Sequence, residues 1–206
     1  MTQGAHNRIC VIMKQILLLS GYAGSGKDAA ASLLMEECGF QRFAFADALK
    51  ELVAVRTGIP VSIFHSSQKD TVVPSSSKHH PKTYRDLLLE VAKEERAKDL
   101  DVFSRIVAEQ IRESEVPGLG MGLINRFVIS DWRYKREESF LRSALEAATY
   151  QIVRVRIKRT SVTPSADPTE HDLDDERMDI VIQNDGSISD LRDAVHSAFR
   201  RSQPGS

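Results

Sequence analysis

The chain has 206 residues, of which 41% are hydrophobic and 28% charged, fractions that exclude wholesale disorder and fibrous repeats. Its 28 basic and 29 acidic residues give a formal net charge of −1, which excludes the basic surplus of a protein that coats nucleic acid. The length suits one α/β domain with a sizeable core, so we predict a single domain over residues 1–206.

Strands and helices are predicted to alternate in the first half of the chain. Lys14–Ser20 is an apolar run that leads into glycines, as in a strand buried on both faces of a parallel sheet. Residues rich in Ala, Leu and Glu predict a helix over Ala29–Cys38. A second strand is expected at Phe43–Phe45, followed by a helix over Asp47–Arg56 with Asp47 as its N-cap.

The second half continues the alternation after a loop-like segment, Ser66–Pro81. The whole order implies right-handed crossovers and a three-layer α/β fold, with a five-stranded parallel sheet and helices on both faces. Ligands of such sheets bind beyond the carboxyl ends of the strands. The predicted helices are Thr83–Lys98, Val102–Glu113, Glu137–Ala148 and Ser189–Arg200, and the predicted strands are Arg126–Asp131, Gln151–Lys158 and Ile180–Ile182.

A glycine-rich segment that begins at Gly21 reads Gly-Tyr-Ala-Gly-Ser-Gly-Lys-Asp and matches the phosphate-binding pattern G-x-x-x-x-G-K. It lies between a predicted strand and a predicted helix, which is the context that this motif requires. Glycines let successive N–H groups turn inward, and a helix N-terminus adds positive potential for phosphate oxygens. We therefore predict a P-loop NTPase fold that binds ATP through Gly21, Gly24, Ser25, Gly26, Lys27 and Asp28.

Two carboxylates are candidates for binding Mg²⁺ beside the phosphates. Asp28 stands where Ser or Thr usually follows the P-loop lysine, and carboxylate oxygen is a ligand that Mg²⁺ accepts. Asp131 ends a predicted strand, where P-loop enzymes place a second carboxylate for the metal or its water. A helix N-cap is the alternative interpretation of Asp131. Lys27 would bridge the β- and γ-phosphates and act in catalysis.

Among P-loop proteins, a small-molecule kinase fits the chain best. The sequence contains neither the D-x-x-G and N-K-x-D segments of a switch GTPase nor the L-S-G-G segment of an ABC-type ATPase. Small kinases insert helices that hold the acceptor and add a lid that excludes water from the transferred group. We expect the substrate-binding insertion at residues 46–114 and the lid at residues 159–178. The core would comprise residues 14–45, 115–158 and 179–200.

Several short segments between Lys14 and Leu191 carry a family resemblance. They are Gly26-Lys27-Asp28, Phe45-Ala-Asp47-Ala-Leu-Lys50, Tyr84-Arg85-Asp-Leu-Leu with Arg96 and Phe103, Ser130-Asp131-Trp-Arg133 with Glu137, Thr169-Glu170-His-Asp-Leu173-Asp, and Ile182-Gln-Asn184-Asp-Gly186. In these segments the chain resembles the deoxynucleoside monophosphate kinases of phages and large DNA viruses. The resemblance implies ATP- and Mg²⁺-dependent phosphorylation of a deoxynucleoside 5′-monophosphate to the diphosphate.

The chain departs from that family pattern at two places. Gly24 stands where family P-loops often carry a basic residue, and Leu89 and Ala92-Lys93 replace the Gln and Gly-Thr that often follow in phage members. Animal phosphomevalonate kinases share the Gly-Lys-Asp loop and a Ser-Asp-x-Arg strand end, so such an enzyme is the second hypothesis. A nucleotide-binding module that regulates a partner is the non-enzyme alternative.

The resemblance also suggests roles for basic side chains outside the P-loop. Arg85 and Arg133 would act in catalysis and bind the acceptor, with Asp131 also on the substrate side. Arg85 would bind the acceptor phosphate, a task that suits the guanidinium fork, or else be a solvent-facing helix residue, and Arg133 would bind that phosphate or the base edge. Arg96 would meet the acceptor or the transferring group, or else pair with a nearby carboxylate. Arg159 would be a catalytic cation that arrives when the lid closes, although Arg156 is an alternative. Asp47 and Lys50 are substrate-binding candidates, with an N-cap and an exposed lysine as the ordinary readings.

Other side chains have simpler interpretations. Arg154, Arg156 and Lys158 share one strand face at period two, which favours an edge strand with a basic solvent face. Packing is the more common use of a lone Trp such as Trp132, although it could stack on a base.

The remaining sequence signals concern location and partners. No apolar run approaches the roughly 20 residues that cross a bilayer, and residues 1–13 lack the long apolar region of a secretory signal. Cys10 and Cys38 are not spaced as a metal-binding pair. We expect a cytoplasmic monomer or homodimer whose partners are the two nucleotide substrates, with no nucleic acid and no membrane among them.

Overall fold

The computed structural model describes residues 14–75, 77–114, 126–146, 149–164 and 170–202. Residues 1–13 with Cys10, residues 115–125 of the predicted core and residues 165–169 of the predicted lid lie outside these ranges. The helix predicted to reach Ala148 ends earlier, at Ala144, with Leu145 as its C-cap. No helix within them is both long enough and apolar enough to span a membrane.

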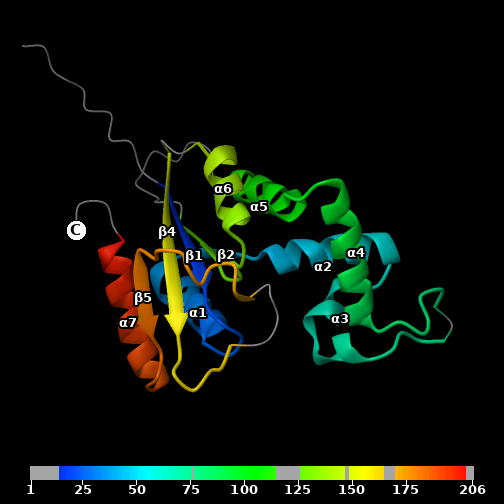
Figure 1. The fold of residues 1–206 in the computed structure, drawn as a ribbon, viewed down its shortest axis with the longest axis horizontal. Helices are drawn as coiled ribbons and strands as arrows, with labels where there is room; N and C mark the ends of the chain where they lie inside the picture. Colours follow the sequence, from blue (N-terminus) through cyan, green and yellow to red (C-terminus); the bar gives the residue numbers. More distant parts are fainter. Residues whose placement is uncertain (1–13, 76, 115–125, 147–148, 165–169, 203–206) are drawn as a thin grey trace, which may run out of the picture.

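Five parallel strands form one open sheet in the order β2-β3-β1-β4-β5 (Figure 1). The central strand β1 (Lys14–Ser20) pairs with β3 (Arg126–Ile129) on one side and with β4 (Tyr150–Lys158) on the other. The edges are β2 (Gln41–Phe43) and β5 (Ile180–Gln183). Because the chain turns from β1 toward β2 first and toward β4 later, the carboxyl end of β1 is the point where the strand order reverses, and ligands bind there in sheets of this kind.

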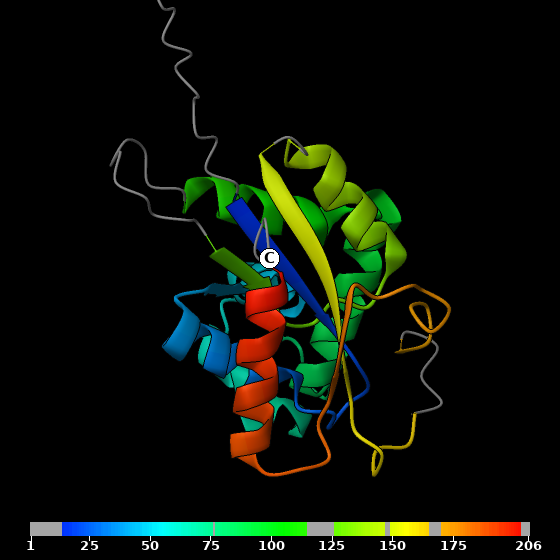
Figure 2. The ribbon, with the colours of Figure 1, turned by 90° about the vertical axis from the view of Figure 1, so that its left-hand side faces the viewer.

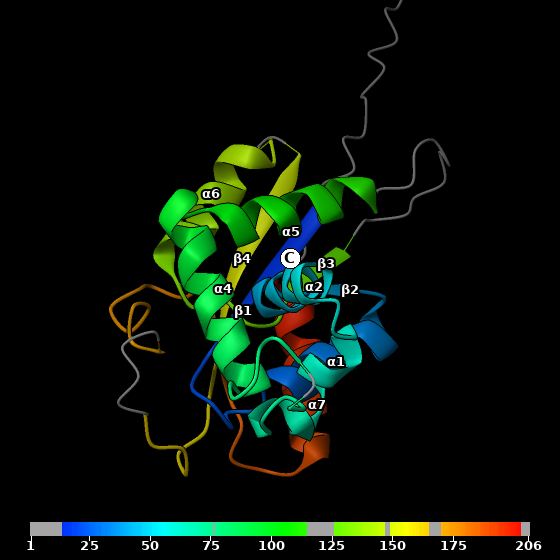
Figure 3. The same ribbon diagram turned by 90° about the vertical axis from the view of Figure 1, so that its right-hand side faces the viewer.

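Helices cover both faces of the sheet, and the predicted three-layer architecture is confirmed. Figure 2 shows α7 in front of the sheet, and Figure 3 shows α2, α4 and α5 in front from the opposite side. The helices α3 and α4 pack against α2 around a further apolar cluster, which includes Val53, Phe64 and Leu87. The bounds are α1 (Lys27–Cys38), α2 (Phe45–Thr57), α3 (Val61–His65), η1 (Ser67–Asp70), α4 (Tyr84–Lys98), α5 (Val102–Glu113), α6 (Lys135–Ala144) and α7 (Ile188–Arg201).

The alternation of side chains along β1 builds the two main apolar cores. Ile16 and Leu18 point into the cluster shared with α2, α5 and α6. Leu17 and Leu19 point into the cluster shared with α1 and α7. All four are at most 3% exposed, as expected for a central strand covered on both faces. Trp132 is 1% exposed and packs in the first of these clusters, so packing is its observed use.

The second strand and the helix after it differ from the prediction. The strand ends at Phe43, the helix begins at Phe45, and Ala44 rather than Asp47 is the N-cap residue. Ala44 offers no side-chain acceptor. The first two N–H groups of α2, from Phe45 and Ala46, instead donate to the carboxylate of Asp131 at 2.9 and 2.8 Å. A distant side chain therefore caps this helix, and nothing local in the sequence indicates it.

The prediction that β4 is an edge strand with a basic solvent face is wrong. β4 lies between β1 and β5. Arg156 is 7% exposed, and Arg154 pairs with Glu138 of α6 at 2.8 Å. Only Lys158, at the strand end, is exposed. Carboxylates of α6 and of the segment after residue 170 pair with Arg154 and Arg156, which is why these two charged side chains can occupy an interior strand.

Candidate functional site

The glycine loop joins β1 to α1 with three glycines in left-handed or related conformations, with φ of 142° at Gly21, 81° at Gly24 and 102° at Gly26. A Cβ at Gly21 would lie 2.3 Å from the main-chain oxygen of Ile157. A Cβ at Gly26 would lie 2.3 Å from Nδ2 of Asn184. The loop is therefore packed against the ends of both β4 and β5, and it has no room for side chains at these two positions.

Asn184 is a positioning residue to which the sequence analysis gave no role. Its side chain is buried and donates from Nδ2 to the main-chain oxygen of Ser25 at 2.8 Å. Its own N–H donates to the main-chain oxygen of Lys158 at 2.7 Å. Asn184 thus ties the glycine loop to the adjacent strand ends. Its position directly after a predicted strand is the signal that could have identified it.

Lys27 lies at the start of α1 and folds back over the loop. Its Nζ donates to the main-chain oxygens of Gly21 at 2.6 Å and of Tyr22 at 3.0 Å. Desolvation, and then the positive charge of Arg133, lowers the pKa of Lys27. The ammonium is therefore held at the helix N-terminus with another cation close by, an arrangement that favours an anionic ligand.

Carboxylates surround this pair of cations. Asp28, Glu170 and Asp131 all raise the pKa of Lys27 through their negative charges, in opposition to the effects above. Glu170 is almost buried, and its Oε1 lies 3.8 Å from Nη1 of Arg133. The structure thus brings together Lys27, Asp28, Asp131 and Arg133, four of the residues that the sequence nominated.

The donor set of Asp28 and Asp131 fits Mg²⁺. Asp28 is exposed beside the loop, and both carboxylates act electrostatically on Lys27. Each oxygen of Asp131 accepts one N–H, from Phe45 or Ala46, and so retains a lone pair for a metal or its water. Mg²⁺ in phosphoryl-transfer sites commonly takes one or two carboxylates, together with phosphate oxygens and water.

Asp47 and Lys50 lie in the first turns of α2, close to this group. Asp47 accepts from Lys50 at 2.7 Å and from Arg42 at 2.8 Å. Desolvation raises the pKa of Asp47, but these two hydrogen bonds outweigh it and leave the pKa lowered. Desolvation raises the pKa of Asp131, and the negative charge of Asp47 adds to that effect. Asp47 therefore acts electrostatically on Asp131, and Lys50 is bound to Asp47.

Two of the predicted arginines lie elsewhere in the structure. Arg85, at the start of α4, is half exposed and forms an ion pair with Asp70. Arg96 lies near the other end of the same helix. Its guanidinium is 5.1 Å from the ring centre of Phe103 and 5.6 Å from that of Tyr134. No contact recorded among the described residues joins either arginine to the glycine loop.

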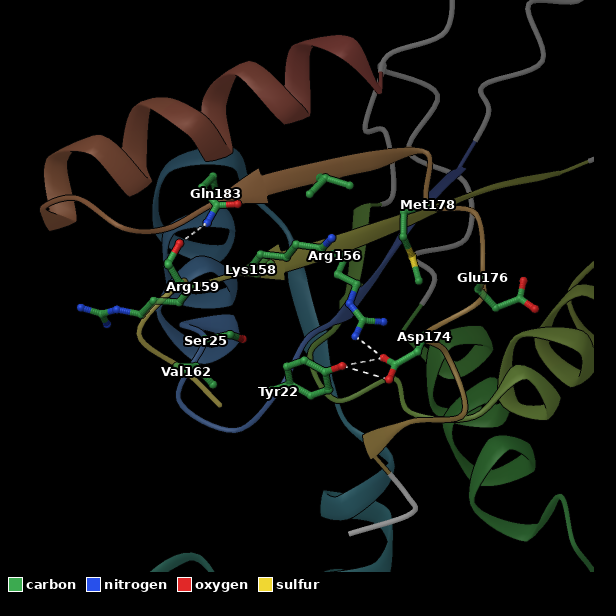
Figure 4. A pocket seen from close by; sticks show the side chains of 13 residues that line it. Tyr22, Ser25, Arg156, Lys158, Arg159, Val162, Asp174, Glu176, Met178 and Gln183 are labelled. Carbon is green, nitrogen blue, oxygen red and sulfur yellow. Dashed lines mark hydrogen bonds and ion pairs between the residues drawn. The ribbon is translucent and has the colours of Figure 1, made fainter. Parts of the chain in front are cut away.

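A cavity of about 570 Å³ opens beside the loop, between the ends of β4 and β5 and the segment that follows residue 173 (Figure 4). Arg156 and Tyr22 both point at Asp174 in its wall, and their hydrogen bonds to Asp174 measure 2.6 and 2.9 Å. Arg156 also donates to the main-chain oxygen of Leu173 at 3.0 Å. Arg159 lines the same cavity with an exposed side chain that points away from this cluster. The two candidate lid arginines thus differ in freedom to move.

Glu137, in the first turn of α6, has an unusually high pKa. Its Oε2 accepts from the N–H groups of Arg133 and Tyr134, both at 3.0 Å. Desolvation nevertheless raises its pKa to about 7, and the charge of Asp131 adds to the effect. Arg96 acts in the opposite direction.

A buried carboxyl group with a raised pKa makes stability depend on pH. Because the pKa of Glu137 is higher in the folded than in the unfolded state, protonation of Glu137 stabilises the folded state. This contribution is complete at a pH below the pKa of the unfolded state, and it is lost as the pH rises through about 7. Between pH 5 and pH 8 we expect the wild-type free energy of unfolding to fall, relative to Glu137→Gln, by on the order of 2 kcal/mol. Urea denaturation of both proteins at the two pH values measures this difference, and parallel profiles would contradict it.

Comparisons with known proteins concern the fold. No protein-family model matches the sequence, and no curated protein matches it. Similar solved structures include dephospho-CoA kinase from Campylobacter jejuni, with 14% identity, a TM-score of 0.49, and coverage of 92% of this chain and 97% of that one. Shikimate kinase from Aquifex aeolicus has 14% identity and a TM-score of 0.45, and the match covers 93% of this chain and 99% of that one. TT1252 from Thermus thermophilus has 16% identity and a TM-score of 0.46, and the match covers 93% of this chain and 100% of that one.

Proposed function

We propose that this protein is a P-loop kinase that transfers the γ-phosphoryl group of ATP to a deoxynucleoside 5′-monophosphate and so forms the diphosphate. The observation that carries the proposal is the glycine loop with Lys27 at the N-terminus of α1 and the second cation, Arg133, acting on it. A donor phosphate and an acceptor phosphate together bring a high negative charge, which this pair of cations would neutralise. The nature of the acceptor rests on the sequence resemblance.

The proposed reaction is an in-line transfer that needs no covalent intermediate on the protein. An oxygen of the acceptor phosphate attacks the γ-phosphorus, and the bond from that phosphorus to the β,γ-bridging oxygen breaks. The loop N–H groups hold the donor phosphates, and Lys27 leaves the carbonyl groups of Gly21 and Tyr22 to bind them. Mg²⁺ held by Asp28 and Asp131 would supply further neutralisation of the phosphate oxygens. The chain contributes mainly position and charge.

The arginines divide between the two substrates in this proposal. Arg133 binds the acceptor phosphate, and Glu170 orients its guanidinium. Asp47 and Lys50 are further candidates for the acceptor side. Arg85 contributes to the acceptor only after its guanidinium leaves Asp70. We assign the lid cation to Arg159, because Arg156 is buried and already bonded to Leu173 and Asp174. A buried guanidinium that holds two partners cannot move toward a substrate without leaving both partners unsatisfied.

Removal of the Arg133 guanidinium is expected to weaken use of the acceptor far more than binding of ATP. We expect Arg133→Ala to lower kcat/KM for the acceptor by about 100-fold, the usual order for one charged contact to a reacting phosphate. Saturation curves for the acceptor at fixed ATP measure this effect. Arg200→Ala, which removes an exposed arginine from the end of α7, is the matched control. Equal losses in the two variants would remove Arg133 from the acceptor site.

Release of ADP in a coupled assay tests the proposed function directly. The acceptors are the four deoxynucleoside monophosphates and phosphomevalonate, and Lys27→Ala serves as the blank. Turnover with at least one deoxynucleotide supports the proposal. Turnover with phosphomevalonate alone would replace it by the second kinase hypothesis. Tight ATP binding with no turnover on any acceptor would favour a regulatory nucleotide-binding module.

A further inference from the structure

One carboxylate, Asp174, joins the glycine loop to the segment that follows residue 170 (Figure 4). Both of its oxygens lie 2.9 Å from the hydroxyl of Tyr22, and its Oδ1 accepts from Nη2 of Arg156 at 2.6 Å. Its Oδ2 lies 2.8 Å from Nδ1 of His171. Desolvation raises the pKa of Asp174, but these three hydrogen-bond partners outweigh that effect and leave the pKa lowered. Asp174 is therefore ionised near neutral pH, and hydrogen bonds to an ionised group are the stronger ones.

Tyr22 is the residue of the glycine loop that is held at this junction. The guanidinium of Arg156 lies 5.1 Å from the centre of its ring, and the ring centre of His171 lies 5.9 Å from it. The main-chain oxygen of Tyr22 accepts from Nζ of Lys27 at 3.0 Å. The residue whose carbonyl group binds the P-loop lysine is thus fixed at its side chain by Asp174, which lies 152 residues later in the chain.

The other end of this contact belongs to a compact turn, residues 170–176. Main-chain hydrogen bonds hold the turn together: the N–H of Asp174 donates to the oxygen of His171 at 3.0 Å, and the N–H of Glu176 donates to that of Leu173 at 3.2 Å. Leu173 is 3% exposed and packs in the core cluster shared with α2, α5 and α6. Because the turn is bonded internally and anchored at its centre, it behaves as one unit.

The same turn contacts the acceptor side of the proposed site. Oε1 of Glu170, whose side chain is 8% exposed, lies 3.8 Å from Nη1 of Arg133. Oδ2 of Asp172 accepts from the N–H of Lys135, the first residue of α6, at 2.8 Å. The turn therefore holds the glycine loop through Asp174 and the acceptor arginine through Glu170. The relative position of the two phosphate-binding groups depends on this turn.

We infer that Asp174 is a positioning residue that couples the donor site to the acceptor site, through Tyr22 on one side and the turn that carries Glu170 on the other. Because Tyr22 and Arg133 are both held to the turn, ATP on the loop and an acceptor phosphate on Arg133 favour the same position of the turn. Each ligand then increases the affinity for the other by the same factor. The inference rests on the proposed function for the identity of the ligands, and it adds the contact that aligns them.

Tyr22→Phe tests this coupling, because it removes the hydroxyl group and keeps the ring beside Arg156. Equilibrium binding of the four deoxynucleoside monophosphates is measured with and without the non-hydrolysable analogue adenosine 5′-(β,γ-imido)triphosphate. We expect wild-type protein to bind at least one monophosphate about 10-fold more tightly when the analogue is present, the usual order of coupling between two sites. In Tyr22→Phe this enhancement should disappear, while the affinity for each ligand alone is unchanged.

Turnover gives a second measurement of the same contact. We expect Tyr22→Phe to lower kcat by about 10-fold, the usual order for one hydrogen bond to a charged group. Tyr150→Phe is the matched control, because the Tyr150 hydroxyl, at the start of β4, is buried and has no hydrogen-bond partner in the described ranges. Asp174→Asn also removes the counter-charge of Arg156, so denaturation curves accompany it. Because Tyr22 and Asp174 act through one contact, the double variant should lose no more kcat than Asp174→Asn alone.

Two results would overturn the inference: no enhancement by the analogue in wild-type protein, or the full wild-type enhancement in Tyr22→Phe. The ADP-release assay separates this failure from failure of the proposed function. Turnover without coupling refutes the role of Asp174 and leaves the kinase standing. Coupled binding with no ADP release supports the role of Asp174 and refutes phosphoryl transfer. If none of the four monophosphates binds, even beside the analogue, both proposals are refuted.

Discussion

Lys27→Ala is expected to lower kcat by at least about 100-fold, the usual order for loss of one group that stabilises a developing charge. The ammonium lies at the N-terminus of α1, bound to the carbonyl groups of Gly21 and Tyr22, and it is partly desolvated there. In a partly desolvated site a charge acts more strongly than in water, so its loss costs more than that of a surface lysine. Single-turnover measurements with saturating ATP report this step.

The loss of kcat should be specific to Lys27 and should not follow from removal of an exposed lysine. Lys93→Ala, on the exposed side of α4, is the matched control and should retain wild-type kcat. Denaturation curves of both variants establish that each is folded. Undiminished turnover of a folded Lys27→Ala protein would remove Lys27 from the mechanism and with it the observation on which the proposed function depends.

Gly21→Ala is expected to have the largest effect on stability. The Cβ would lie 2.3 Å from the main-chain oxygen of Ile157, and φ is 142°, a conformation that alanine rarely adopts. The obstacle is the backbone of an interior strand, so no side chain can rotate away from it. Strain in φ and overpacking together are expected to lower the free energy of unfolding by about 4 kcal/mol. Urea denaturation measures the loss.

A second glycine separates the two contributions to that loss. Gly58, after α2, has φ of 73° but no atom within 4 Å of a Cβ built on it. Gly58→Ala should therefore cost only the conformational strain, about 1 kcal/mol. ATP affinity should fall in Gly21→Ala, because the loop must shift to relieve the contact, and should be unchanged in Gly58→Ala. Equal stability of the two variants would contradict the close packing of the loop against β4.

Local patterns predicted most of the elements and the glycine loop. β1 was predicted with its observed bounds, as was α5, because continuous apolar residues and helical periodicity are properties of neighbouring positions. The strand before α2 was placed two residues late, since Phe43 and Phe45 are both apolar and either could continue a strand. A short apolar run does not by itself show at which residue the strand ends.

The chain-distant contacts of the site could not be predicted in this way. Asp131 was nominated for its place at a strand end, but its capping of α2 depends on where β3 lies beside β2. Arg156 was expected at a solvent face, but it is buried and binds Leu173 and Asp174, which lie in a segment after β4. Arg85 and Arg96 were predicted on one helix, but their partners, Asp70 for Arg85 and the rings of Phe103 and Tyr134 for Arg96, lie outside α4 and could not be predicted.

The amino-acid sequence by itself determined the alternation of strands and helices and the loop that can wrap a phosphate, because both follow from residues close together in the chain. Tertiary structure decided which cation stays buried, which carboxylate caps a distant helix, and which side chains meet around the glycine loop. Those outcomes depend on strand order and helix packing, which bring together groups tens of residues apart. Only there do desolvation and neighbouring charges act on Lys27 and Glu137 and set their chemistry.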